Sequence, residues 1–212
     1  MGNRVNVVQA KGQDVVPLMD FSKPLQLKPI TPGWHHKTFS FKDPMKLSFL
    51  KKDNFSALKC ETKNAASMLF RHVDISLDEY PTLSWNWMVE KNITSPVDEK
   101  TADGDDSAAR LFISFSVPNE EPRQMELIWA RQLKRGSKKF THHFNHFVVR
   151  GKNNSTQKWY SERLNLKKVY QEFWKDKKPA RIELISILCD TDNTGTSSAA
   201  YFSDIKSRKK GK

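Results

Sequence analysis

Residues 82–90 read TLSWNWMVE, and this stretch decides the fold class. Its apolar residues Leu83, Trp85, Trp87 and Val89 fall at every second position. A period of two places these side chains on one face of a β-strand. We therefore expect a strand here, with both tryptophans buried in a hydrophobic core.

The same alternation recurs from Trp34 onward. In residues 111–117 four apolar residues share one face, whereas Phe112, Ser114 and Ser116 take the other. The alternation predicts about ten strands in all. The remaining candidates are Phe39/Phe41, Leu47/Phe49, 65–73, 124–131, 143–150, 157–163, 181–189 and 199–206. Short strands separated by Gly, Pro, Asn and Asp loops predict a mainly β, single-domain β-sandwich, jelly-roll-like in type, rather than an α/β fold.

One segment has a helical period. Within residues 164–176, Leu166, Val169, Tyr170 and Phe173 follow the spacing of a helix face, and Pro179 follows. This predicts one short α-helix.

The ends of the chain lack either period. Four prolines in residues 12–33 favour an irregular arm. The expected organisation is an irregular N-terminal arm at 1–33, a β-sandwich domain at 34–206 and a mobile basic tail at 207–212.

The chain of 212 residues has 36 Lys and Arg against 24 Asp and Glu, a net charge of +12. The excess is concentrated in 131–139, 167–181 and 203–212. Clustered positive charge favours an anionic partner, such as an acidic glycan, a phospholipid head group or nucleic acid. A solvated surface that serves only solubility accounts for such runs as well.

Five residues are candidates for ligand binding. Arg131, Lys134 and Arg135 would supply positive charge, on the condition that 131–139 and 167–181 lie on one side of the sandwich. Trp159 lies near a strand start beside Arg163, where an exposed indole would stack on a sugar ring.

Residues 190–195 read DTDNTG and predict a calcium loop. Asp190, Asp192 and Thr194 occupy alternate positions, and Gly195 allows a sharp turn, as in loops that wrap a hard cation with side-chain oxygens. The twelfth position is Tyr201 rather than a closing Glu. The alternative is a tight turn in which short polar side chains cap backbone N–H groups.

A second acidic loop, residues 103–106, reads DGDD. We expect Asp105 or Asp106 to pair with Arg110 or to cap the turn. A metal-dependent hydrolase is an alternative function, and it requires this loop and 190–195 to converge in one cleft.

The histidines and cysteines give weaker signals. If THHFNH is a strand, His142 and His146 share one face and His143 takes the other, which argues against zinc. Cys60 and Cys189 permit at most one disulfide, and buried free thiols are the favoured interpretation.

Several ordered motifs carry a family resemblance. They are ASMLFRHV at 66–73, YPTLSWNW at 80–87, GDDSAAR at 104–110, IWA at 128–130, WYSER at 159–163, DTDNTG at 190–195 and AYFSDI at 200–205. Together they resemble the bacterial domain-of-unknown-function family numbered three-zero-four-seven. The resemblance implies a bacterial, commonly exported protein with one mainly β domain, and it brings no catalytic residue.

These observations lead to one expected function and two alternatives. We expect a non-catalytic secreted or periplasmic protein that binds an acidic glycan or phospholipid head group, with calcium as its only candidate cofactor. Export rests on the resemblance, because Met1 to Lys11 lack an apolar signal core. The alternatives are the metal-dependent hydrolase and a nucleic-acid-binding protein, although no nucleic-acid-binding module is recognisable.

Overall fold

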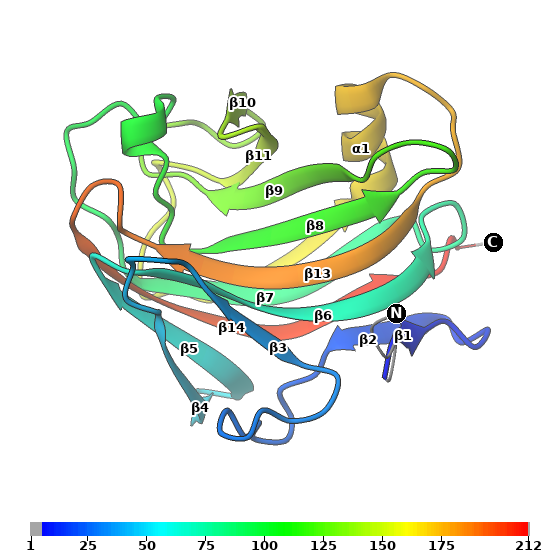
Figure 1. The fold of residues 1–212 in the computed structure, drawn as a ribbon, viewed down its shortest axis with the longest axis horizontal. Coiled ribbons are helices and arrows are strands. Elements are labelled where there is room, and N and C mark those ends of the chain that lie inside the picture. Colours follow the sequence, from blue (N-terminus) through cyan, green and yellow to red (C-terminus); the bar gives the residue numbers. More distant parts are fainter. Residues whose placement is uncertain (1–5, 212) are drawn as a thin grey trace.

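The computed structural model describes residues 6–211, and these form two β-sheets packed face to face (Figure 1). The two sheets and single short α-helix confirm the predicted mainly β, jelly-roll-like sandwich. No helix within residues 6–211 has the length and apolar character needed to span a membrane.

The larger sheet has eight strands. In spatial order they are β1 (Val8–Gln9), β6 (Ala66–Ser76), β13 (Arg181–Asp190), β8 (Arg110–Ser116), β9 (Arg123–Trp129), β11 (Phe144–Arg150) and β10 (Lys138–Thr141), with β3 (His35–Thr38) also pairing with β6. Figure 1 shows β6, β13, β8 and β9 as neighbouring, curved strands.

The smaller sheet has six strands. In spatial order they are β12 (Tyr160–Asn165), β7 (Thr82–Lys91), β14 (Ser197–Arg208), β5 (Phe55–Lys63) and β4 (Lys46–Lys52), with β2 (Val15–Met19) also pairing with β14. The two short helical segments are η1 (Ala102–Gly104) and α1 (Leu166–Trp174).

The core lies between the sheets. Trp85 and Trp87 on β7 are 1% and 0% exposed, which confirms the prediction for residues 82–90. Trp129 from the opposite sheet meets Trp87 edge to face, with ring centroids 5.6 Å apart. Such offset aromatic pairs add to the free energy gained by burial.

The helix confirms its prediction. Leu166, Val169 and Tyr170 are buried, and the Asn165 side chain accepts a hydrogen bond from the Lys168 N–H at the helix start. The helix ends at Trp174, before Pro179, and the residue that caps it, Lys175, has a left-handed φ of 53°.

The cysteine prediction is wrong. Cys60 on β5 and Cys189 on β13 form a disulfide that joins the two sheets, with Cα atoms 6.4 Å apart. The two residues are 129 positions apart in the chain. Their proximity therefore arises only from the packing of one sheet on the other.

The expected arm and tail also need correction. Within residues 6–33, β2 joins the smaller sheet, and its Pro17 is tolerated because β2 is an edge strand. The predicted tail begins inside β14, and the Lys209 N–H donates to the Asp14 carbonyl. Residues 1–5 and 212 lie outside the described part of the chain.

Candidate functional site

The outer face of the larger sheet, turned away from the core, carries many apolar side chains. Seven of them form a cluster separate from the core, namely Phe39, Met68, Phe70, Phe112, Phe144, Leu184 and Leu188. Sheets that face water normally alternate apolar and polar residues, with the polar ones outward. An apolar cluster on an outer face is typical of a surface that binds another molecule.

One row of paired residues crosses this face from strand to strand. Its members are His35, Phe70, Ser186, Phe112, Glu126, His146 and Lys139. Residues directly opposite one another on neighbouring strands point to the same face. The row contains two phenylalanines on β6 and β8 and charged groups on β9, β11 and β10. The apolar cluster and the charged groups therefore belong to one surface.

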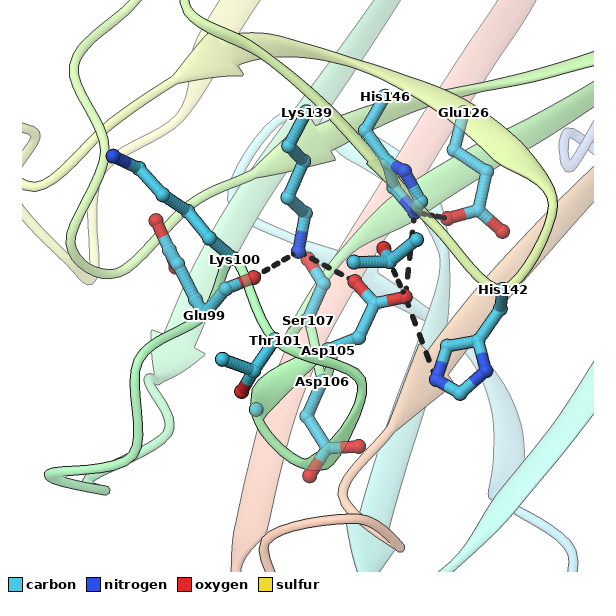
Figure 2. Close-up of polar contacts among 12 residues, drawn as sticks. Glu99, Lys100, Thr101, Asp105, Asp106, Ser107, Glu126, Lys139, His142 and His146 are labelled. Carbon is cyan, nitrogen blue, oxygen red and sulfur yellow. Dashed lines mark hydrogen bonds and ion pairs between the residues drawn. The ribbon is translucent and has the colours of Figure 1, made fainter.

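The charged end of the row is a buried group of side chains that we call the ion cluster. Figure 2 labels four of its members, Asp105, Glu126, Lys139 and His146. It comprises Asp105, Arg110, Glu126, Lys139 and His146. Arg110 donates to the Glu126 carboxylate at 2.6 Å, and His146 Nε2 lies 2.8 Å from the same oxygen. All five side chains are at most 5% exposed.

Asp105 connects the ion cluster to the loop before β8. Its carboxylate accepts hydrogen bonds from Lys139 Nζ at 2.5 Å and Thr141 Oγ1 at 2.8 Å. Lys139 also donates to the Glu99 carbonyl, as Figure 2 shows. The loop at 98–106 is therefore fixed against β10 by charged hydrogen bonds.

Opposite charges decide the ionisation of two acids in the ion cluster. Burial acts to raise the pKa of Asp105 and of Glu126. The positive charge of Arg110 is the largest opposing effect in both cases, and the pKa of each acid lies below its usual value. Both carboxylates are thus held ionised in spite of their burial.

The two acidic loops do converge. Carboxylate oxygens of Asp106, Asp190 and Asp192 lie within 4.8 Å of one another. Asp105 does not join them, because its carboxylate faces Lys139 instead. Three of the four acids that a metal-dependent hydrolase would use therefore lie together.

Each converging carboxylate already has partners. Asp106 accepts from the backbone N–H groups of Asn193 and Thr194 and from the Thr194 hydroxyl, at 2.5–3.2 Å. Asp190 pairs with Arg110 at 2.9 Å, and Asp192 pairs with Lys42 at 3.1 Å. These contacts fit the capped tight turn, the alternative to a calcium loop, and Asp106 supplies the cap.

The pKa of Asp190 is shifted in the opposite direction to those of the two acids in the ion cluster. Burial is the largest effect and raises its pKa well above the usual value, and the neighbouring Asp106 adds to that rise. Arg110 opposes the rise without reversing it. We expected Asp105 or Asp106 to pair with Arg110 or to cap the turn. The pairing is wrong for their side chains, because the carboxylate partners of Arg110 are Glu126 and Asp190, and Asp105 offers only its backbone carbonyl. The Asp106 carboxylate does cap backbone N–H groups, although they belong to the turn at 190–195.

The histidine prediction is wrong in part. His142 and His143 do not lie on a strand, since they form the turn between β10 and β11 with φ of 49° and 70°. His146 does lie on β11 and is fully buried beside Glu126. His142 Nε2 lies 4.0 Å from the Asp105 carboxylate, on the solvent-exposed side of the ion cluster.

The predicted ligand residues do not converge. Arg131 is 5% exposed and donates to the carbonyls of Val97 and Gly104, so its guanidinium is engaged with the loop at 97–104. Lys134 and Arg135 are exposed in the loop between β9 and β10. Lys138 pairs with Glu172 of α1 at 2.6 Å, so 131–139 and the helix do lie on one side of the molecule.

Trp159 and Arg163 lie on the other sheet. The Trp159 ring packs on Phe55 with centroids 4.4 Å apart, and its Nε1 donates to Asp53 at 2.9 Å. Arg163 is exposed on β12. They belong to the outer face of the smaller sheet, which is a different surface from the apolar cluster.

Sequence reasoning missed the apolar cluster, although one signal was present. The alternation in 111–117 placed Phe112 among serines on the outward face. A phenylalanine at a position expected to be polar is the local sign of a binding face. Its neighbours Phe70 and Phe144 come from strands far away in the sequence.

The family comparison gives one match. A family model described as "Protein of unknown function (DUF3047)" covers residues 32–206. No curated protein matches the chain.

Several solved structures resemble the fold. A family 30 carbohydrate-binding module of a Clostridium thermocellum cellulosomal cellulase has a TM-score of 0.49 at 9% identity, covering 93% of this chain and 99% of its own. The xyloglucanase domain of NopAA from Sinorhizobium fredii has 0.48 at 9%, covering 84% and 93%. A carbohydrate-binding module specific for non-crystalline cellulose has 0.46 at 12%, covering 97% and 99%. At these identities and TM-scores, the similarity carries no argument about a ligand.

Proposed function

Because the chain belongs to the DUF3047 family, whose description names no activity, we propose a function from the geometry: the protein binds a carbohydrate chain across the outer face of the larger sheet. The observation that carries this proposal is the apolar cluster, with its partly exposed Phe70 and Phe144. Sugar rings present C–H faces that pack on aromatic rings, while their hydroxyls bond to nearby polar groups.

The spacing along the row supports an extended ligand. Phe70 and Phe112 lie on β6 and β8, with Ser186 of β13 between them. Neighbouring strands are about 4.8 Å apart, so the two phenylalanines are separated by roughly 10 Å. Phe112 itself is 8% exposed and is covered by the Phe144 ring, which meets it edge to face at 5.4 Å. A chain of sugar rings that runs across the strands would therefore meet the partly exposed rings of Phe70 and Phe144.

Polar side chains at the border of the cluster would bond to sugar hydroxyls. Ser114 on β8 donates to Glu183 on β13 at 2.7 Å, and Gln124 on the adjacent β9 lies directly opposite Ser114. Glu183 and Gln124 are partly exposed. A few polar groups around an apolar floor are the usual composition of a small-molecule or glycan site.

We propose binding without catalysis. A glycosidase needs two carboxyl groups that face the scissile bond from either side. Asp105 and Glu126, the two acids of the ion cluster, are each 3% exposed at the side chain and are paired with cations. Their geometry suits a support that holds the loop at 98–106 and the turn at His142 in place.

Export is part of the proposal. The Cys60–Cys189 disulfide supports it, because disulfides persist in oxidising compartments such as the periplasm or the cell exterior. Calcium binding at Asp190, Asp192 and Thr194 stays a prediction. The contacts of these residues with Arg110, Lys42 and Asp106 supply positive charge and hydrogen bonds where a cation would sit.

Affinity electrophoresis in gels that contain soluble polysaccharides tests the proposal. We expect at least one β-linked polysaccharide to retard the protein, and Phe70→Ala to weaken binding about fivefold, from about 1 kcal/mol of aromatic stacking. Phe140→Ala is a matched control, because Phe140 is 65% exposed and faces away from Lys139 on β10. It should leave binding unchanged.

The variant Trp159→Ala tests which of the two outer faces binds the ligand. If binding falls in this variant and not in Phe70→Ala, the ligand lies on the smaller sheet and the proposed site is wrong. Retardation by no polysaccharide, together with binding to anionic phospholipid vesicles or to DNA, would replace the carbohydrate by one of those partners.

A further inference from the structure

One edge of the apolar cluster carries three basic side chains, which we call the histidine edge: His35 and Lys37 on β3 and His72 on β6. His35 and Lys37 are two positions apart on a strand and share the outward face. The rings of His35 and His72 lie 5.3 Å apart, edge to face. All three residues are exposed.

Phe70 holds the two imidazoles. The His35 ring stacks on Phe70 with centroids 4.9 Å apart, and the His72 ring meets Phe70 edge-on at 5.5 Å. Phe70 is also the aromatic residue that the proposed function assigns to the floor of the site. A sugar ring on Phe70 would thus have the histidines at its side.

The histidine edge has no acidic partner among residues 6–211. None of its three side chains makes an ion pair or a hydrogen bond there, and Lys37 lies only over the Phe39 ring at 5.8 Å. Most other basic groups of the larger sheet are paired, as Arg110 and Lys139 are. Three unpaired bases beside an apolar floor are suited to an anion that comes from a ligand.

The neighbouring strands carry two carboxylates near the histidine edge, and each has a partner of its own. Asp74, two residues after His72, pairs with Arg181. Glu183 on β13 is the acceptor for Ser114. On the far side, β1 contributes Val8 and Gln9, which are uncharged.

We propose that the histidine edge binds the acidic group, a carboxylate or a sulfate ester, of an anionic glycan whose sugar ring stacks on Phe70. This inference rests on the proposed function and narrows its ligand from carbohydrates in general to acidic polysaccharides. The bound anion would lie between the two imidazoles and within reach of the Lys37 ammonium.

The inference predicts how binding depends on pH. Partial desolvation of the His35 ring lowers its pKa, and the neighbouring His72 lowers it further. In the free protein His35 is therefore neutral near pH 7, and an anion between the rings would favour its protonated form. Binding should strengthen as the pH falls from about 7.5 to about 5.5, since histidine charges in that range.

Matched pairs of glycans that differ only in charge test the inference. Suitable pairs are polygalacturonate and its methyl ester, C6-oxidised and unoxidised cello-oligosaccharides, and sulfated and desulfated galactan, each measured by calorimetry at low salt. We expect one anionic member to bind about tenfold more tightly than its neutral partner at about pH 5.5, from two or three exposed charge pairs. The preference should shrink at about pH 7.5.

The variant His35→Gln/His72→Gln removes both imidazole rings while keeping polar side chains. It should bring the affinity of the anionic glycan to within about twofold of the neutral one, because the exposed charge pairs are lost. His143→Gln is the matched control, since His143 is an exposed histidine outside the histidine edge. It should keep the full preference, which separates a local anion site from the net charge of +12.

Failure of the anion site can be distinguished from failure of the proposed function. If neutral glycans bind and no anionic partner binds more tightly, or if the double variant keeps the preference, the histidine edge is not an anion site and the proposed function stands. If no glycan of either kind binds, the proposed function fails and this inference fails with it.

Discussion

The two outer faces of the sandwich differ in how their side chains are satisfied. On the smaller sheet, Lys59 pairs with Glu61 and Glu90 at 3.2 and 2.9 Å, and the Tyr201 hydroxyl donates to Glu90. On the larger sheet, seven apolar side chains lie beside an unpaired histidine edge. Charged groups that pair with one another need no further partner, whereas apolar surface beside unpaired bases is suited to a ligand.

Both faces contain ion pairs, but their burial differs. The side chains of the Arg110–Glu126 pair are 4% and 3% exposed. Lys59 and Glu90 are 18% and 34% exposed. Breaking a buried pair leaves a charge without water or partner, whereas an exposed charge regains its hydration.

The largest expected effect is therefore at Arg110. Arg110→Ala leaves Glu126 and Asp190 without their guanidinium and should lower the free energy of unfolding by about 3–5 kcal/mol. Lys59→Ala, the matched change on the smaller sheet, should cost about 1 kcal/mol or less. Urea unfolding of both variants measures the difference, and equal losses would show that the two faces do not differ energetically.

The disulfide between the faces should have the next largest effect. Cys60→Ala/Cys189→Ala removes a crosslink that closes a long loop, so unfolding should become easier by about 2–5 kcal/mol. Addition of a reductant should destabilise the native protein by a similar amount and leave the double variant unaffected. A reductant that does not change the melting temperature of the native protein would contradict this.

The acidic loops give a smaller effect. Asp106 caps two backbone N–H groups, so Asp106→Ala should cost about 1–2 kcal/mol. Asp192→Ala breaks only its pair with Lys42 and should cost about 1 kcal/mol or less. If calcium raises the melting temperature of the native protein and not that of Asp192→Ala, the loop is a metal site as well as a capped turn.

The pH dependence of stability distinguishes the two kinds of buried acid. Asp105 and Glu126 have lowered pKa values, so the stability that they contribute is present above about pH 4.3 and is lost as the pH falls through their folded values. Asp190 has a raised pKa, so its contribution is greatest below about pH 3.9 and is lost as the pH rises through its folded value.

Conservative variants separate these contributions. Glu126→Gln should reduce the loss of stability on acidification, whereas Asp190→Asn should reduce the loss as the pH rises. Melting temperatures at a series of pH values measure both effects. If the melting temperatures of both variants depended on pH in the same direction relative to the native protein, Arg110 would affect the two acids alike.

Local sequence patterns predicted the elements that are decided locally. Alternation identified the strand at 82–90 and its buried tryptophans, and the helical period identified α1. The strand β5 was missed because its buried residues, Leu58, Cys60 and Thr62, alternate with charged ones but are only weakly apolar as a set. The prolines in residues 12–33 concealed β2, since an edge strand tolerates Pro17.

The candidate site could not be predicted in the same way. His35, Phe112 and Lys139 come from three distant strands, and only the pairing of the sheet places them in one row. The same is true of Cys60 and Cys189. A single sequence contains the residue types but no record of which strand pairs with which.

The position of β14 in the smaller sheet has a consequence for the order of folding. It is the last strand in sequence, yet it lies between β7 and β5 and pairs with both of them and with β2. During synthesis these three strands lack their common partner until residues 197–208 have been made. The smaller sheet therefore closes late, and the apolar residues of its inner face stay exposed to aggregation until it does.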